Sequence, residues 1–227
     1  NGKGYKLLKG IDRNKDQSYV LFTLTQRELS SLLLPVGQYS KEVIRELAAD
    51  AGLAVADKPD SQEICFIPDG DYRKFVSDRH KPRPGDIVDM EGNHLGSHPG
   101  IHFYTIGQRR ALGLNGNTGV PKYVISIDPT TNLVTVGDEE QLYKNKFWAS
   151  AVNFISGSQP VDSIDVTAKI RYKASEAKAN ILLHGKWAEV FFKHPQKAVT
   201  AGQAIVFYEQ NEMLGGGIIE LSEPPDR

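Results

Sequence analysis

The residue with the most reactive side chain in this sequence is Cys65, the only cysteine among 227 residues. A free cysteine is most often a small buried hydrophobic residue, and the apolar neighbours Ile64, Phe66 and Ile67 favour that interpretation. The alternative is a nucleophile or a sulfur carrier, whose active form is a thiolate or a persulfide. Because acidic residues surround this segment, a reactive Cys65 requires a cation from elsewhere in the fold, a helix N-terminus, or conversion to a persulfide, which ionises more readily than a thiol.

The six histidines suggest two further kinds of site. No local signature pairs one of them with the cysteine as a catalytic base, which makes a cysteine hydrolase the least favoured enzyme class. His94, His98 and His102 are spaced by four residues, which would place three metal ligands on one face of a helix. Gly96 and Pro99-Gly100 interrupt any helix there, so we expect turn or surface histidines and no metal site.

Cations cluster along the chain although the formal net charge is only -1. Lys169, Arg171 and Lys173 alternate along an expected strand, so their side chains would project from one face. Such a face could hold the phosphates of a nucleic acid or be a solvated charged surface, and the residues alone leave both interpretations open. Arg109 and Arg110 lie in a glycine-rich loop and are further candidates for phosphate contact.

The composition excludes several classes of protein. A single cysteine cannot form an internal disulfide or a four-cysteine zinc site. No apolar run approaches the ~18 residues that cross a membrane, and the first residues lack the apolar core of a signal peptide. We therefore expect a cytoplasmic protein with no membrane partner.

Helix signals occupy residues 1–76, the part of the chain that must position Cys65. Capping boxes are expected at Asn14 and Thr25, each followed three residues later by Gln or Glu. Ser40 should cap a longer helix that Gly52 ends. The helix after Thr25 should turn three leucines inward, namely Leu29, Leu32 and Leu33.

Strand signals take over after residue 76. Between residues 77 and 143 they predict strands at 86–90, 94–96, 102–106, 123–127 and 133–136. From residue 144 to residue 227 they predict strands at 147–153, 165–172, 178–183, 187–192, 204–208 and 216–221. Short strands at this spacing are typical of a small barrel or a sandwich. The run Gly215-Gly216-Gly217 predicts a bulge or bend within one strand.

Five motifs occur in one order along the chain, and their combination is far more specific than any one of them. They are Asn14-Lys15-Asp16-Gln17-Ser18-Tyr19, Asp60-Ser61-Gln62-Glu63-Ile64-Cys65-Phe66-Ile67, His102-Phe103-Tyr104-Thr105-Ile106-Gly107-Gln108-Arg109-Arg110, Lys169-Ile170-Arg171-Tyr172 and Ala198-Val199-Thr200-Ala201-Gly202-Gln203. Together they closely resemble the bacterial tRNA-specific 2-thiouridylase family over essentially the whole chain.

This resemblance implies an enzyme that makes 2-thiouridine at the wobble position of tRNA. In the family, ATP with magnesium adenylates the C2 oxygen of the uridine, and a cysteine persulfide loaded by an upstream sulfur-carrier protein delivers the sulfur. Cys65 matches the cysteine that carries the persulfide. The residues that match tRNA contacts are Lys15, Asp16, Gln17, Arg171, Tyr172 and Gln203.

The resemblance also implies the fold class, which is α+β and mostly β. Residues 1–76 would be the helical C-terminal part of an α/β nucleotide-binding domain of the pyrophosphate-loop type. Residues 77–143 would form a small central β domain, and residues 144–227 a six-stranded antiparallel β-barrel that binds tRNA.

Parts of the family pattern do not occur in this sequence, namely the Ser-Gly-Gly-x-Asp-Ser loop, an Asn-Pro-Asp segment and a second catalytic cysteine. We therefore expect a fragment that keeps part of the tRNA surface and is inactive alone. The alternative, from another class, is a non-enzymatic RNA-binding barrel in which Cys65 merely packs.

Overall fold

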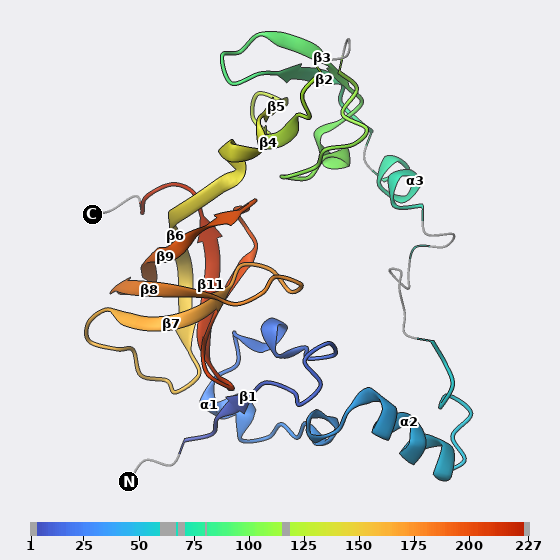
Figure 1. Cartoon of the computed structure of the whole chain (residues 1–227), viewed down its shortest axis with the longest axis vertical. Helices are drawn as coiled ribbons and strands as arrows, with labels where there is room; N and C mark the ends of the chain where they lie inside the picture. The colour runs from blue at the N-terminus through green and yellow to red at the C-terminus, as the bar shows by residue number, and fades with distance from the viewer. Residues whose placement is uncertain (1–3, 60–66, 68–70, 80, 115–118, 225–227) are drawn as a thin grey trace. The chain divides into compact units, whose positions relative to one another are not determined.

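The chain folds into two compact units in a computed structural model that describes residues 4–59, 67, 71–79, 81–114 and 119–224 (Figure 1). One unit combines Asn1–Lys58, Asn145–Pro195 and Thr200–Arg227. The other combines Pro59–Lys144 and Gln196–Val199. The sequence-based boundaries after residues 76 and 143 stay a prediction.

A closed β-barrel forms the centre of the first unit (Figure 1). Its strands are β6 (Tyr143–Phe154), β7 (Ile164–Lys169), β8 (Ala177–His184), β9 (Trp187–Lys197), β10 (Ala204–Glu209) and β11 (Glu212–Glu220). Their order is β11-β10-β7-β8-β9-β6, and antiparallel pairing of β11 with β6 closes the ring. The predicted six-stranded antiparallel barrel is therefore confirmed.

Alternation of side chains explains why these segments form strands around one core. Val166 and Ala168 of β7 are buried between more exposed neighbours, as are Ala179 and Ile181 of β8. Pairing places Val166 opposite Ala179, so the inward residues of the two strands meet inside the barrel.

The N-terminal segment packs on this barrel and shares its core. Strand β1 (Leu7–Leu8) pairs antiparallel with the start of β11, with Leu7 opposite Met213. The 3-10 helix η1 (Ser18–Leu21) and the one-turn helix α1 (Gln26–Leu29) follow. One buried cluster joins the segment to the barrel and contains Leu7, Tyr19, Phe22, Leu29, Ile155, Val206, Tyr208 and Met213.

Polar contacts fix the same docking. The Asn153 side-chain amide on β6 donates to the carbonyls of Phe22 and Leu24 at 2.8 and 3.1 Å. The Gln26 amide donates to the carbonyls of Tyr5 and Ile155 at 2.8 and 2.6 Å. Because these amides satisfy carbonyls in or beside the apolar contact, the chain up to α1 belongs to the barrel unit.

The glycine run in β11 lets the N-terminal segment come close. A Cβ on Gly216 would lie 2.5 Å from the carbonyl oxygen of Ile205 and 2.9 Å from the ring of Phe22. The pairing of β11 with β6 shifts register between Gly216 and Ile218, which confirms the predicted bulge. The absence of a side chain at Gly216 therefore permits both the pairing of β11 with β10 and the close packing of Phe22 on β11.

The structure confirms the helix caps predicted at Thr25 and Ser40 and the helix end predicted at Gly52. Thr25 forms a capping box with Glu28 at α1, and the Ser40 hydroxyl accepts the Val43 amide proton at 3.4 Å at the start of α2 (Lys41–Asp50). Gly52 follows α2 with φ +69° and ends it.

The expected short helix after Asn14 is η1, but the expected capping box at Asn14 is wrong. Gln17 precedes η1, and the Asp16 carboxylate accepts the amide proton of Ser18 at 3.0 Å. The expected inward position of Leu33 is also wrong. Leu33 is 88% exposed because α1 ends at Leu29, so the later leucines never share its inward face.

The second unit contains a four-stranded sheet. Its strands are β2 (Gly85–Val88), β3 (His94–His98), β4 (Tyr123–Asp128) and β5 (Leu133–Gly137), in the order β3-β2-β5-β4. Only the β2–β5 pair is parallel among the described pairs of this sheet. The unit also contains α3 (Tyr72–Ser77), η4 (Ile101–Phe103) and η5 (Glu139–Leu142). Its buried cluster consists of Ile87, Tyr104, Leu112, Val124, Val134 and Val136.

The strand predicted at 102–106 is wrong, because the helix η4 begins at Ile101. The amides of Phe103 and Tyr104 donate to the carbonyls of Gly100 and Ile101 at 3.2 and 3.1 Å, which are turn bonds rather than ladder bonds. Ile101, Phe103 and Tyr104 all contact the buried cluster, a spacing that a strand cannot provide on one face.

The three evenly spaced histidines lie in different settings. His94 Nε2 lies 3.4 Å from a carboxylate oxygen of Asp86, whereas His98 is buried with Nε2 3.1 Å from the carbonyl of Asn132. His102 belongs to η4. Among the described residues, no group of three or more His, Cys, Asp or Glu side chains could hold a metal ion. The described helices are also too short or too polar to cross a membrane.

The packing at Gly216 predicts a large effect from one methyl group. Gly216→Ala should lower the free energy of unfolding by about 1–3 kcal/mol, because the new Cβ meets the Ile205 carbonyl and the Phe22 ring. Gly37→Ala is the matched control, since a Cβ there meets nothing within 4 Å. Urea denaturation of both variants checks this, and equal midpoints would contradict the packing.

Candidate nucleic-acid interface

The six residues predicted to contact tRNA all lie in the barrel unit, on three separate segments. Lys15, Asp16 and Gln17 lie in the loop between β1 and η1. Arg171 and Tyr172 lie in the turn after β7, and Gln203 lies immediately before β10. All except the half-buried Asp16 are exposed.

Tyr19 brings these three segments together. Its ring centroid lies 6.3 Å from that of Tyr172, and its hydroxyl donates to the carbonyl of Ala204 at 2.6 Å. Tyr19 itself sits two residues after Gln17, and Ala204 directly follows Gln203. We call the exposed residues Lys15, Gln17, Arg171, Tyr172 and Gln203 the Tyr19 surface.

Burial sets the protonation state of Tyr19. It raises the pKa of this phenol to about 12, although the positive charge of Arg171 acts in the opposite direction. Tyr19 therefore stays a neutral hydrogen-bond donor to the Ala204 carbonyl despite the positive charge of Arg171.

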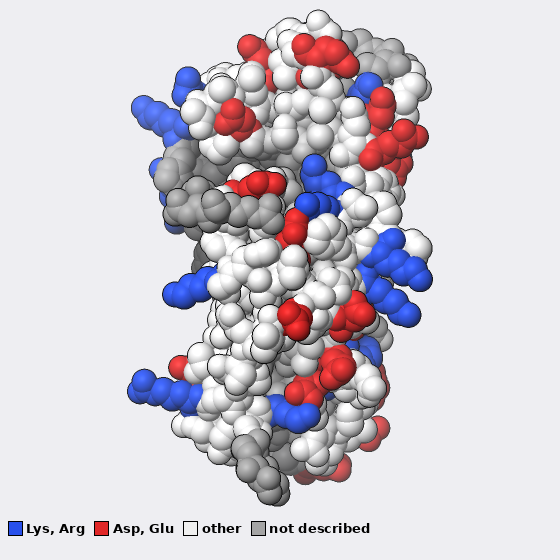
Figure 2. Space-filling view, turned by 90° about the vertical axis from the view of Figure 1, so that its left-hand side faces the viewer, with Lys and Arg blue, Asp and Glu red and all other residues white. Residues whose placement is uncertain are grey.

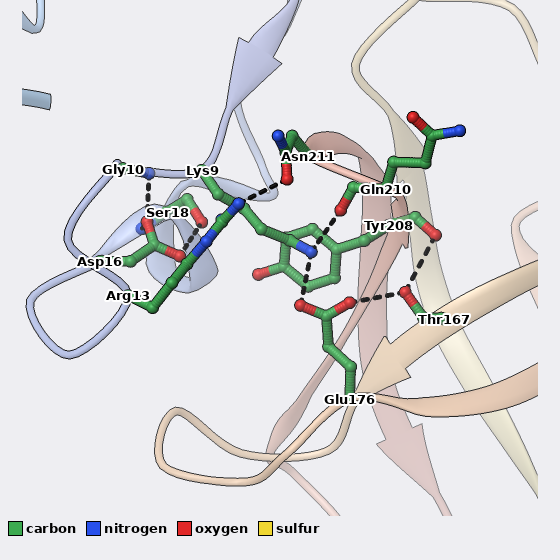
Figure 3. Close-up of polar contacts among 10 residues, drawn as sticks. All are labelled: Lys9, Gly10, Arg13, Asp16, Ser18, Thr167, Glu176, Tyr208, Gln210 and Asn211. Carbon is green, nitrogen blue, oxygen red and sulfur yellow. Dashed lines mark hydrogen bonds and ion pairs between the residues drawn. The ribbon is translucent and has the colours of Figure 1, made fainter. Parts of the chain in front are cut away.

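Asp16 shapes the loop that presents its neighbours (Figure 3). One carboxylate oxygen accepts the amide protons of Gly10 and Ser18, both at 3.0 Å, and the other accepts the Ser18 hydroxyl at 2.9 Å. Because these three bonds occupy the carboxylate inside the loop, its contribution is to place Lys15 and Gln17 rather than to face an anion.

The expected row of cations on one strand face is wrong. Strand β7 ends at Lys169, Ile170 is buried, and Arg171 begins a turn that the Ala174 amide closes on the Arg171 carbonyl at 3.0 Å. The pairing of β7 with β8 forces this reversal, so Arg171 and Lys173 project from a turn instead of a strand.

Charge alone does not mark an interface. Figure 2 shows basic and acidic side chains intermingled over the face that it presents. Tyr19 lies within the first motif, but its place at the centre of these contacts is not predicted from the sequence, because its side chain is neither charged nor nucleophilic. Its only signal is a large aromatic residue beside polar loop residues.

The sequence also singled out Cys65, Arg109 and Arg110. Cys65 is outside the described residues, so its surroundings stay a prediction. Arg109 and Arg110 are exposed in the second unit, where the positive charge of Arg109 helps to lower the pKa of Glu139. A larger share of that lowering comes from Lys197, which forms an ion pair with the same carboxylate.

Three family models match the chain in order. A tRNA methyl transferase HUP domain covers residues 1–69, a tRNA methyl transferase PRC-barrel domain covers residues 73–138, and an aminomethyltransferase beta-barrel domain covers residues 144–219. Relatives named tRNA-specific 2-thiouridylase MnmA are 48% identical in Carboxydothermus hydrogenoformans and 49% identical in Heliobacterium modesticaldum. Each alignment covers 95% of this chain. The chain belongs to the tRNA-specific 2-thiouridylase family.

The chain spans 60% of the length of the Carboxydothermus 2-thiouridylase and 57% of the Heliobacterium 2-thiouridylase. The match to a HUP domain fits nucleotide binding in this family. Within residues 4–59, however, β1 pairs antiparallel with the barrel strand β11, and the sequence contains no Ser-Gly-Gly-x-Asp-Ser loop. These residues do not build an ATP site, so we assign no step through ATP to them.

Proposed function

We propose that this chain is the tRNA-binding part of an enzyme that converts the wobble uridine of tRNA to 2-thiouridine in the cytoplasm. The observation that carries the proposal is the convergence at Tyr19 of three segments that resemble the tRNA contacts of the family. The proposed reaction rests on the names of the relatives, and the proposed binding site for the RNA rests on the Tyr19 surface.

The Tyr19 surface has the chemistry that structured RNA requires. Lys15 and Arg171 supply cations for phosphates, and the half-exposed ring of Tyr172 offers a face for a base or ribose. The amides of Gln17 and Gln203 can both donate and accept hydrogen bonds. This mixture suits a folded RNA, whose backbone shape and unpaired bases are read together.

Cys65 is proposed as the sulfur carrier. A sulfur-carrier protein would transfer its terminal sulfur to the Cys65 thiolate and leave as a thiol, which makes a persulfide on Cys65. The terminal sulfur of the persulfide would then attack C2 of a uridine whose C2 oxygen has been adenylated by ATP with magnesium, and the C2–O bond would break as AMP leaves with that oxygen. A second thiol would release the thiouridine by attacking the Cys65 sulfur, which leaves a disulfide. This chain holds neither that thiol nor the ATP loop.

A non-enzymatic tRNA-binding module is the second candidate function. It is favoured by the location of all five residues of the Tyr19 surface in the barrel unit. The two candidates differ only in what Cys65 does, so one residue decides between them.

The Tyr19 surface predicts a specific loss on removal of one cation. Arg171→Ala should weaken the binding of unmodified tRNA about tenfold and lower the salt slope of log affinity by about one phosphate contact. Lys186→Ala, in the exposed turn between β8 and β9, is the matched control and should change neither quantity. Fluorescence anisotropy across a salt series measures both. An unchanged slope for Arg171→Ala would place this residue outside the interface.

The sulfur-carrier role predicts a covalent product on this chain. Incubation with a cysteine desulfurase and cysteine should add one sulfur atom to Cys65, which mass spectrometry detects and a reductant removes. Cys65→Ser should lose the added sulfur and keep the wild-type tRNA affinity. A chain that binds tRNA but never accepts sulfur would support the non-enzymatic module instead.

A further inference from the structure

An ion pair joins the N-terminal segment to the barrel (Figure 3). The Lys9 side chain is 7% exposed and that of Glu176 is 26% exposed, and Lys9 Nζ lies 2.5 Å from a carboxylate oxygen of Glu176. The same ammonium donates to the carbonyl of Gln210 at 2.6 Å and lies 4.3 Å from the ring centroid of Tyr208. These contacts enclose the cation, so Lys9 does not reach a ligand on the surface.

Glu176 continues the network into the barrel wall. Its second oxygen accepts the Thr167 hydroxyl proton at 2.6 Å, and that hydroxyl also lies 3.3 Å from the Tyr208 carbonyl. Lys9 therefore connects the N-terminal segment to β7, to β10 and to the turn that precedes β8.

The two charged residues stand next to the two main segments of the Tyr19 surface. Lys9 directly precedes the loop from Gly10 to Ser18, which presents Lys15 and Gln17. Glu176 follows the turn that presents Arg171 and Tyr172. We propose that the Lys9–Glu176 pair is a positioning device that holds these two segments at the spacing tRNA requires, an inference that rests on the proposed function.

The length of β1 explains why such a device is needed. Only Leu7 and Leu8 pair with β11, and a slip of one residue would exchange the buried Leu7 for the exposed Leu8 and displace the loop that follows. Burial of Leu7 and the bond from the Lys9 amide to the Asn211 carbonyl at 2.9 Å already favour the observed register. The Lys9 ammonium adds contacts with Glu176, Gln210 and the Tyr208 ring that fit this same register. A buried ion pair adds little net stability over apolar residues of similar size, so placement is its better-supported role.

The test separates placement from direct contact. Lys9→Met keeps the side-chain stem and removes the charge, and Lys6→Met is the matched control because Lys6 pairs with Glu212 at 2.6 Å while 68% exposed. We expect Lys9→Met to weaken tRNA binding about tenfold with no change in salt slope, since no phosphate contact is lost. Lys6→Met should leave the affinity within about twofold of wild type. A slope that falls by about one for Lys9→Met would show that Lys9 contacts phosphate, and an unchanged affinity would show that the pair positions nothing.

Lys9→Met leaves the Glu176 carboxylate without its ion-pair partner, so a loss of tRNA binding in this variant could come from unfolding. A second variant controls for that outcome. The double variant Lys9→Met/Glu176→Met removes both charges of the pair and should fold. Its tRNA affinity should be no lower than that of Lys9→Met or of Glu176→Met, whichever binds more weakly. This follows because the two residues form one contact, so that losing the second partner adds no further loss. Wild-type affinity in the double variant, or additive losses, would overturn the proposal.

A measurement without RNA distinguishes this proposal from the proposed function. In the double variant, amide hydrogen exchange should speed up in both residues 10–18 and residues 171–176, and not in β8 or β9. If the wild-type chain bound no tRNA while this coupled exchange appeared, the proposed function would fail and the linkage of the two segments would stand. Unchanged exchange in both segments would overturn the linkage itself.

Discussion

Burial of apolar side chains between the N-terminal segment and the barrel is the constraint on which the candidate interface depends. Tyr19, Phe22 and Leu29 share one cluster with barrel residues such as Val206 and Met213. The helices that carry Tyr19 and Leu29 are too short to persist alone, since η1 and α1 have four residues each. Their conformation therefore comes from the barrel surface, and the bare backbone at Gly216 gives Phe22 the room to reach it.

This docking turns three distant stretches of sequence into one surface. The loop from Gly10 to Ser18 would be an unstructured tether without the internal bonds of Asp16 and the apolar anchor of Tyr19. A chain with a formal net charge of -1 has no general attraction for RNA. The proposed binding of tRNA would therefore depend on a few well-placed cations, amides and rings, for which geometry matters more than total charge.

Local rules predicted much of the fold. The barrel strands follow from side-chain alternation, and the caps at Thr25 and Ser40 follow from residue type. The errors arise where long-range pairing decides: β7 stops at Lys169 because it must reverse into β8, and Leu33 is exposed because α1 ends after one turn. The order of the motifs indicates which residues to test as tRNA contacts, and those contacts stay a prediction. Motif order could not show that Tyr19 joins these residues or that Lys9 and Glu176 meet, because both facts depend on tertiary contacts.

Amide hydrogen exchange of the wild-type chain with and without tRNA tests the central claim most directly. If the docked segment and the barrel present one surface, tRNA should protect residues 10–18, the turn at 171–173 and the residues around Gln203 together, over one range of tRNA concentration. The hairpin turn at 184–186 should show no protection. Protection of the barrel turn with residues 10–18 unaffected, or protection of the two at different tRNA concentrations, would contradict the account.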